Sequence, residues 1–371
     1  MGDGLYAVGE AGCRATLGRS YTRLRMPYQL PPDPSTARRA RVTEWVTFLF
    51  AALLVVLVAY FGYVGYEGSR QFTEAPAPSA DCRTPATMGW EYEAVNYDRE
   101  GDAALAAEPD PRSCTSRGAP AGNDVTGPGG IGLAGWYVPA GNGAADASTV
   151  VIAHGWGSSK HDMLDRAAIL HEDYHVLLLD FRNHGQSSEA ATTQGVREAA
   201  DLRAMIDWLE ETKSPGRIAV LGVSMGGASA LAEADRDDRI DAVIVESTHA
   251  TLTNAITARL DRAGYPLSLP ASWAVLLGSL MRTGEDASGV DPVGSIGRLD
   301  GRPVLLVYGG LDGSIGRTDG EDLRAAAEAA GSPVTLHVCA EAGHAQSLDA
   351  CGEEYSGWVL GFLERALGPD G

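Results

Sequence analysis

A serine lies between glycines at a point where an aliphatic run gives way to an alanine-rich one. The stretch RIAVLGVSMGGASALAEA, residues 217–234, places Ser224 between Gly222 and Gly226. A nucleophile on a strained strand-to-helix turn needs small residues on both sides. The amides at the start of the following helix would favour a developing negative charge. The G-x-S-x-G spacing alone is weak evidence, but in this context we interpret Ser224 as a nucleophile and not as part of a plain turn.

A serine hydroxyl becomes a strong nucleophile only when a base removes its proton. The chain has eight histidines. His344, in CAEAGHAQS, follows an apolar run at the edge where Ser224 is expected, and we predict that it is the general base. His249 could line the pocket. We assign the others to turns, helices or a strand: His154, His161, His171, His175, His184 and His337.

The base in turn needs an acid that fixes its tautomer and balances the imidazolium. Asp312, in VLLVYGGLDGS, follows one long apolar run, and Glu246, in AVIVEST, ends another. An acid at either position could instead cap a helix. We favour Asp312 and keep Glu246 as its rival.

Alternating apolar runs and helical stretches must position these residues. The apolar runs, rich in Val, Ile and Leu, predict eight strands within residues 90–97, 130–138, 149–153, 175–180, 217–222, 240–245, 302–309 and 333–339. Helical patterns cover residues 162–172, 196–211, 226–236, 321–330 and 353–367. This alternation predicts an α/β fold, a mostly parallel eight-stranded sheet with helices on both faces. Ligands bind at the carboxyl ends of the strands in such sheets.

The segment WVTFLFAALLVVLVAYFGYV, residues 45–64, has no charge and is long enough to cross a bilayer as a helix. A buried core helix and a cleaved signal peptide are the alternatives. Arg38, Arg39 and Arg41 precede the segment, which predicts a cytoplasmic N-terminus and an extracellular catalytic domain at the cell membrane. We predict a cytoplasmic tail at 1–44, a transmembrane helix at 45–64, an extracellular linker at 65–89 and the catalytic domain at 90–371.

Four of the five cysteines fall on the predicted outer side, where disulfides persist. Proximity in the sequence favours pairing Cys82 with Cys114 and Cys339 with Cys351, although buried free thiols remain an alternative. The second bridge would close a loop around His344. The cysteine spacing of a metal site is absent, and we expect neither a metal nor a cofactor. A net charge of -20 argues against nucleic acid as a partner.

Five ordered motifs resemble those of the α/β-hydrolases: AHGWGSSKHDM, LLLDFRNHGQS, LGVSMGG, RPVLLVYGGLDGS and EAGHAQS. The order Ser, Asp, His also matches that fold. The likeness covers about residues 131–366. It is greatest to membrane-anchored or secreted bacterial members of the serine-aminopeptidase-like and BEM46-like branch. The resemblance implies an oxyanion hole formed by the amides of Trp156 and Met225.

The resemblance and the triad together predict a serine hydrolase that cleaves an ester, a thioester or an amide of a small or lipid-like acyl substrate. Residues 250–298 could form a small cap or an ordinary covering helix. A non-catalytic membrane-tethered binding domain and a cofactor-free perhydrolase or haloperoxidase are the alternatives. No ordered acidic pair for a peptide N-terminus is apparent, so the residues do not support aminopeptidase activity.

Overall fold

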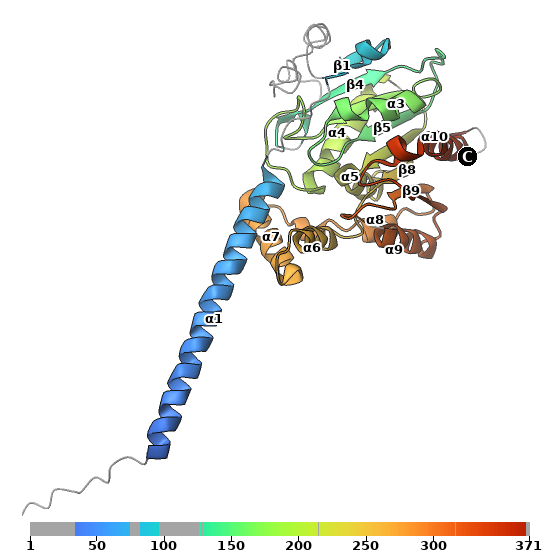
Figure 1. The fold of residues 1–371 in the computed structure, drawn as a ribbon. Coiled ribbons are helices and arrows are strands. Elements are labelled where there is room, and N and C mark those ends of the chain that lie inside the picture. The colour runs from blue at the N-terminus through green and yellow to red at the C-terminus, as the bar shows by residue number, and fades with distance from the viewer. Residues whose placement is uncertain are drawn as a thin grey trace, which may run out of the picture. The chain divides into compact units, whose positions relative to one another are not determined.

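The computed structural model describes residues 34–74, 82–95, 126–127, 129–213, 215–315 and 317–368 (Figure 1). Eight strands form one sheet in the order β1-β4-β6-β5-β7-β8-β9-β10. β4 is antiparallel to both its neighbours, and the pairs from β6 to β10 are parallel. The strands are β1 (Glu93–Val95), β4 (Ala134–Val138), β5 (Thr149–Ala153), β6 (His175–Asp180), β7 (Ile218–Val223), β8 (Ile240–Glu246), β9 (Val304–Gly309) and β10 (Val334–Cys339). A separate ribbon pairs β2 (Thr126–Gly127) with β3 (Ile131–Gly132).

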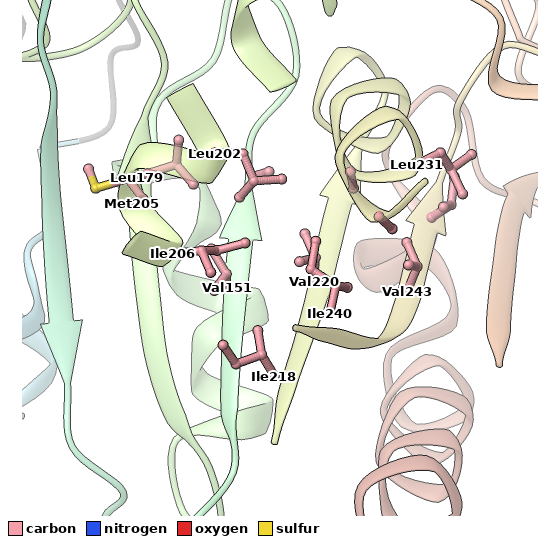
Figure 2. Close-up of a cluster of buried hydrophobic side chains, with 14 of the residues drawn as sticks. Val151, Leu179, Leu202, Met205, Ile206, Ile218, Val220, Leu231, Ile240 and Val243 are labelled. Carbon is pink, nitrogen blue, oxygen red and sulfur yellow. The ribbon is translucent and has the colours of Figure 1, made fainter. Parts of the chain in front are cut away.

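Helices cover both faces of the sheet, and alternate strand residues face each layer. Val151 and Val220 point into one core cluster, whereas Ile152 and Leu221 point into the other. The first cluster, part of which Figure 2 shows, is completed by α4 (Val196–Lys213), α5 (Met225–Ala234), α8 (Pro292–Ile296) and α9 (Arg317–Ala329). The second is completed by α3 (Leu164–Leu170) and α10 (Ser347–Leu367). The predicted α/β-hydrolase fold class is confirmed.

One N-terminal helix, α1 (Pro34–Thr73), is long and apolar enough over residues 38–73 to cross a membrane. The contacts divide the chain after Val56, and residues 57–371 form one compact unit. Within that unit, Val64 of α1 packs into a third apolar cluster with α6 (Leu252–Arg262) and α7 (Ser268–Thr283). Gly65 and Gly68 lie against Ala274 and Val275 of α7, so closely that an added Cβ would clash.

The predicted linker at 65–89 differs from the structure over residues 65–73, which continue α1. Charged residues such as Glu67 and Arg70 interrupt the apolar pattern there, but they pair along the helix surface. A short turn of 3-10 helix, Pro85–Met88, lies further along the predicted linker. The compact unit therefore includes residues 57–73 of α1, ahead of the boundary predicted at residue 90.

The structure pairs Cys339, at the end of β10, with Cys351 in α10. The helix is interrupted at this bridge, because Cys351 and Gly352 take non-helical backbone angles. Cys82 is also disulfide-bonded. Cys114 lies outside the described residues, so its pairing with Cys82 stays a prediction.

Candidate active site

Ser224 lies on a sharp turn between β7 and α5. Its backbone angles, φ 53° and ψ −114°, are unusual for a residue with a side chain. A Cβ at Gly222 would overlap the backbone of Gly226, and a Cβ at Gly226 would overlap the carbonyl of Ala153 on the next strand. Only glycine therefore fits at either position, and the turn presents the serine hydroxyl at the carboxyl ends of the strands.

A chain of hydrogen bonds connects the three predicted catalytic side chains. His344 Nε2 lies 3.1 Å from Ser224 Oγ, and His344 Nδ1 lies 2.7 Å from Asp312 Oδ2. With Nδ1 protonated toward the carboxylate, Nε2 is free to accept the serine proton. The residues come from the loops after β7, β9 and β10, which end at the same edge of the sheet.

The Asp312 carboxylate is buried and fully partnered. Its Oδ1 accepts hydrogen bonds from the amides of Ser314 and Ile315, at 2.8 and 3.0 Å. Burial raises the pKa of the Asp312 carboxyl, but the hydrogen bond and charge of His344 and the two amides outweigh it and hold the pKa below its ordinary value. The acid is therefore ionised beside the imidazole.

Glu246, the rival acid, has a different position and different partners. Its carboxylate forms a buried ion pair with Arg166, at 2.8 and 2.9 Å, and accepts a hydrogen bond from the Tyr355 hydroxyl at 3.0 Å. Arg166 also donates to the carbonyl of Ala345, at 2.9 Å, and Ser247 Oγ accepts from the Ala345 amide at 3.1 Å. These contacts fix the residue that follows His344. The Glu246 side chain therefore supports the His344 loop and does not contact His344, a role that the sequence reasoning missed.

Two residues with backbone amides that could bind an oxyanion lie beside the serine. Met225 follows Ser224 directly and is the first residue of α5. Trp156 follows Gly155, which lies so close to the serine that a Cβ added to it would be 3.3 Å from the Ser224 Cβ. Within the described part of the chain, neither the Met225 nor the Trp156 amide donates a hydrogen bond. Both therefore remain available to an oxyanion, the role that the sequence predicts for them.

Three further histidines surround this edge of the sheet. His154 and His184 hold the loop that carries Trp156, because their Nε2 atoms accept hydrogen bonds from the amides of Phe181 and Gly157. His249 is buried and lines the cavity. Burial, followed by the charge of His344, lowers the pKa of His249 to about 4, so His249 is neutral at pH 7.

A cavity of about 280 Å³ opens at Ser224 and His344. Phe72 of α1, Trp156 and Leu252 form apolar parts of its wall, and Arg259 and Arg262 of α6 line it as well. The sequence reasoning named neither arginine nor Phe72; the two basic residues in ITARLDR, residues 256–262, were the only available signal. Of the residues that the structure describes, no group of three or more His, Cys, Asp or Glu could hold a metal ion.

Comparison with known proteins identifies the family. A family model described as alpha/beta hydrolase fold matches residues 148–273. The uncharacterized protein YqkD of Bacillus subtilis is 30% identical over 226 residues, which are 59% of this chain and 72% of that protein. The uncharacterized protein YfhR of Escherichia coli K12 is 26% identical over 267 residues, 70% of this chain and 84% of that one.

Among solved structures, the Pyrococcus furiosus esterase Pf2001 superimposes with a TM-score of 0.61 and 22% identity, covering 80% of this chain and 99% of that one. At this level of identity the likeness concerns the fold. The matched motifs, the sheet order and the serine turn all agree with it, and the chain belongs to the α/β-hydrolase fold family.

Proposed function

We propose that the protein is a serine hydrolase that cleaves an ester, with a thioester or amide as the chemically related alternative, through an acyl-enzyme on Ser224. The hydrogen-bonded series Ser224–His344–Asp312, open to a cavity, carries this proposal. The fold alone does not define a reaction. An esterase among the structural neighbours agrees with the assignment.

In the first half of the reaction, Ser224 Oγ attacks the acyl carbon while His344 Nε2 takes its proton. Asp312 stabilises the imidazolium, and the amides of Trp156 and Met225 donate to the oxyanion. His344 then protonates the leaving alcohol as the bond between carbonyl carbon and alcohol oxygen breaks. In the second half, His344 takes a proton from water, the resulting hydroxide equivalent attacks the acyl carbon, and Ser224 recovers its proton as the acid leaves.

We further propose that the chain belongs to the BEM46-like branch and that α1 anchors the protein in the cell membrane, with the N-terminus cytoplasmic and the compact unit outside. The apolar character of α1 supports the anchor. Arg38, Arg39 and Arg41, in the first turns of α1, support the orientation. A disulfide at Cys339 is typical of an oxidising compartment.

A fluorophosphonate probe tests the proposed reaction. We expect the probe to label the wild-type protein, and we expect Ser224→Ala to abolish both labelling and ester hydrolysis. Labelling that persists in Ser224→Ala would place the nucleophile elsewhere. An unlabelled wild-type protein would instead favour a non-catalytic binding domain, and peroxide-dependent halogenation stronger than ester hydrolysis would favour a perhydrolase.

A further inference from the structure

The charge of the catalytic cavity is opposite to that of the whole chain. The sequence has 49 Asp and Glu against 29 Lys and Arg. The cavity at Ser224 is lined by Arg259 and Arg262 and, among the residues described, by no aspartate or glutamate. An anion in this cavity would therefore meet two positive charges before any negative one.

Both arginines lie in the last turn of α6 and are exposed to the cavity. The guanidinium of Arg259 lies over the rings of Trp156 and Phe72, 5.6 and 5.7 Å from their centroids. Arg262 reaches toward the loop that carries Asp312, with its Nη1 3.6 Å from where a Cβ at Gly313 would lie.

Neither guanidinium forms a hydrogen bond or ion pair with the part of the chain that the structure describes. Aromatic rings satisfy only the face of a guanidinium, so the N–H donors at its edge remain free. Arg166 and Arg203 differ from Arg259 and Arg262 in this respect, because each of them forms an ion pair with a carboxylate.

A third polar group in the cavity also lacks a partner. His249 is only 4% exposed, and its Nε2 has no hydrogen bond within the described residues. A buried polar atom without a partner is unfavourable unless a ligand or water completes it. The cavity therefore offers unfilled hydrogen-bonding positions at a neutral ring and at two cations.

We propose that Arg259 and Arg262 bind a carboxylate or phosphate group of the substrate, so that the enzyme prefers acyl esters that carry a negative charge away from the scissile bond. A planar guanidinium matches both anions through paired N–H donors. This inference rests on the proposed hydrolase activity and adds the charge of its substrate.

Paired esters test this preference in the full-length protein. The 4-nitrophenyl monoester of glutaric acid keeps a free carboxylate, and its methyl-capped counterpart is neutral. A hydrogen bond to a charged group is worth roughly tenfold or more in affinity. We expect wild-type kcat/KM to favour the free acid by about tenfold or more, and Arg259→Gln or Arg262→Gln to reduce that ratio by about tenfold.

A matched control removes one positive charge elsewhere. Arg236 lies two residues beyond the far end of α5 from Ser224 and is exposed. Arg236→Gln should leave the ratio unchanged. Inorganic phosphate and glutarate serve as competing anions; inhibition by either supports the proposal, and the more potent one identifies the recognised group. A wild-type preference for the capped ester, or a ratio that survives both substitutions, would overturn it.

Measurements of anion binding test the proposed anion site independently of the hydrolase proposal. If neither ester is hydrolysed and no probe labels Ser224, the hydrolase proposal fails. Calorimetric titration of glutarate and phosphate into Ser224→Ala then measures anion binding without turnover. Binding that weakens about tenfold in Arg259→Gln supports the anion site, and absence of binding of either anion contradicts it.

A second inference rests on a separate surface, the exposed apolar face of α7. Among the described residues of the compact unit, the exposed large apolar side chains other than Leu311 lie on the end of α1 or at α7. They are Val58, Tyr63, Tyr66, Leu267, Leu269, Trp273, Leu277, Leu280 and Met281. Met281 is 80% exposed and Leu277 58%. A contiguous face of this kind marks an interaction surface.

An apolar groove of about 520 Å³ lies where α7 meets the end of α1. Phe61 and Gly65 line one side, and Ala274, Leu277 and Met281 line the other. Arg282, at the end of α7, lies over the Tyr66 ring, 4.7 Å from its centroid. A basic side chain beside an aromatic ring is typical of the headgroup region of a bilayer.

We infer that this face of α7 lies in the bilayer interface and that lipid acyl chains fill the groove. The face is continuous with α1, the helix proposed to cross the membrane, and α7 has 16 residues, too few to span one. Such a placement brings the catalytic unit against the membrane through α6, which packs on α7.

Photoreactive lipids test this placement. The full-length protein is incorporated into nanodiscs that contain a phospholipid with a diazirine in its acyl chain, irradiated and mapped by mass spectrometry. We expect adducts on α1 and on residues 268–281, and none on the exposed face of α9. Leu277→Glu should reduce the α7 adducts severalfold and leave those on α1. Adducts on α1 alone would overturn the inference and favour a second copy of the chain on α7, whereas no adducts on α1 would contradict the membrane anchor itself.

Discussion

At Ser224, the backbone takes a conformation that residues with side chains rarely adopt, and the surrounding glycines make that conformation possible. The hydroxyl thereby faces His344 and not the helix that follows. The strain is held by contacts on both sides, among them the hydrogen bond from the Ser224 amide to the Glu246 carbonyl at 2.8 Å.

Asp312 should govern catalysis far more than folding. Asp312→Asn keeps the shape of the side chain but removes the charge that stabilises the imidazolium, and we expect kcat/KM for an ester to fall by about 10³- to 10⁴-fold. Asp322→Asn makes the same chemical change on an exposed part of α9 and should have no effect. Ester kinetics with circular dichroism distinguish the two; a loss smaller than tenfold in Asp312→Asn would contradict the assignment.

His249 should make stability depend on pH. Its pKa is about 4 in the folded protein and near 6.5 when unfolded, so between these values the unfolded state binds the extra proton. Folding stability therefore falls as pH is lowered from 6.5 to 4, by up to about 3 kcal/mol for a shift of this size.

Replacement of His249 by asparagine removes the contribution of this histidine to the pH dependence of stability. We expect the stability advantage of the wild type over His249→Asn to shrink as pH falls from 7 to 4, measured by denaturant unfolding in detergent. A difference that stays constant with pH would show that His249 titrates normally.

The convergence of Ser224, Asp312 and His344 could be predicted because each follows an apolar run, and in a parallel sheet those runs end at one edge. Arg166 could not be predicted in its role, because it lies in a helix and contacts Glu246 eighty residues later. Nothing local in the sequence shows that contact. The structure distinguishes Asp312 from Glu246 by contacts that the sequence does not show, because His344 contacts Asp312 and Arg166 pairs with Glu246.

At the scale of elements, α3, β8 and the His344 loop are joined by one buried ion pair. Removing one member of such a pair leaves an unpaired buried charge. We expect Arg166→Met to lower the free energy of unfolding by about 3–5 kcal/mol. The double variant Arg166→Met/Glu246→Leu should lose much less stability, because no charge remains buried.

Activity measurements on these variants distinguish the role of Arg166 in positioning the His344 loop from its role in stability. Both should show reduced kcat, because the hydrogen bond from Arg166 to the Ala345 carbonyl is lost in each. Unfolding curves and ester kinetics at one temperature measure the two effects. A single variant as stable as the double one would show that Glu246 finds another partner or a proton.

The elements between β8 and β9 were the least predictable. α6 and α7 form where the sequence allowed either a cap or a covering helix, and the apolar run near Trp273 has one buried face and one exposed face. Periodicity identifies an apolar face but not what covers it. That information lies in non-local packing with the end of α1.

At the scale of the whole molecule, the boundary of the compact unit after Val56 has measurable consequences. A chain that begins at Leu57 keeps the packing of Val64 and Phe72, and we expect it to fold and to hydrolyse esters. A chain that begins at Trp90 exposes the third apolar cluster. Burial of two such side chains contributes roughly 3 kcal/mol or more, so we expect lower thermal stability and aggregation, measured by scanning fluorimetry and size-exclusion chromatography. Equal stability of the two chains would contradict the boundary after Val56.

Phe72 lies one residue before the end of α1 and forms part of the catalytic cavity wall. The helix proposed as an anchor is thus also a component of the substrate site. During evolution such a helix could not be exchanged freely for another hydrophobic segment, since its final turns would have to remain compatible with the ester being cleaved. Divergence in specificity among relatives should accordingly be accompanied by substitutions at the end of this helix as well as in the catalytic loops.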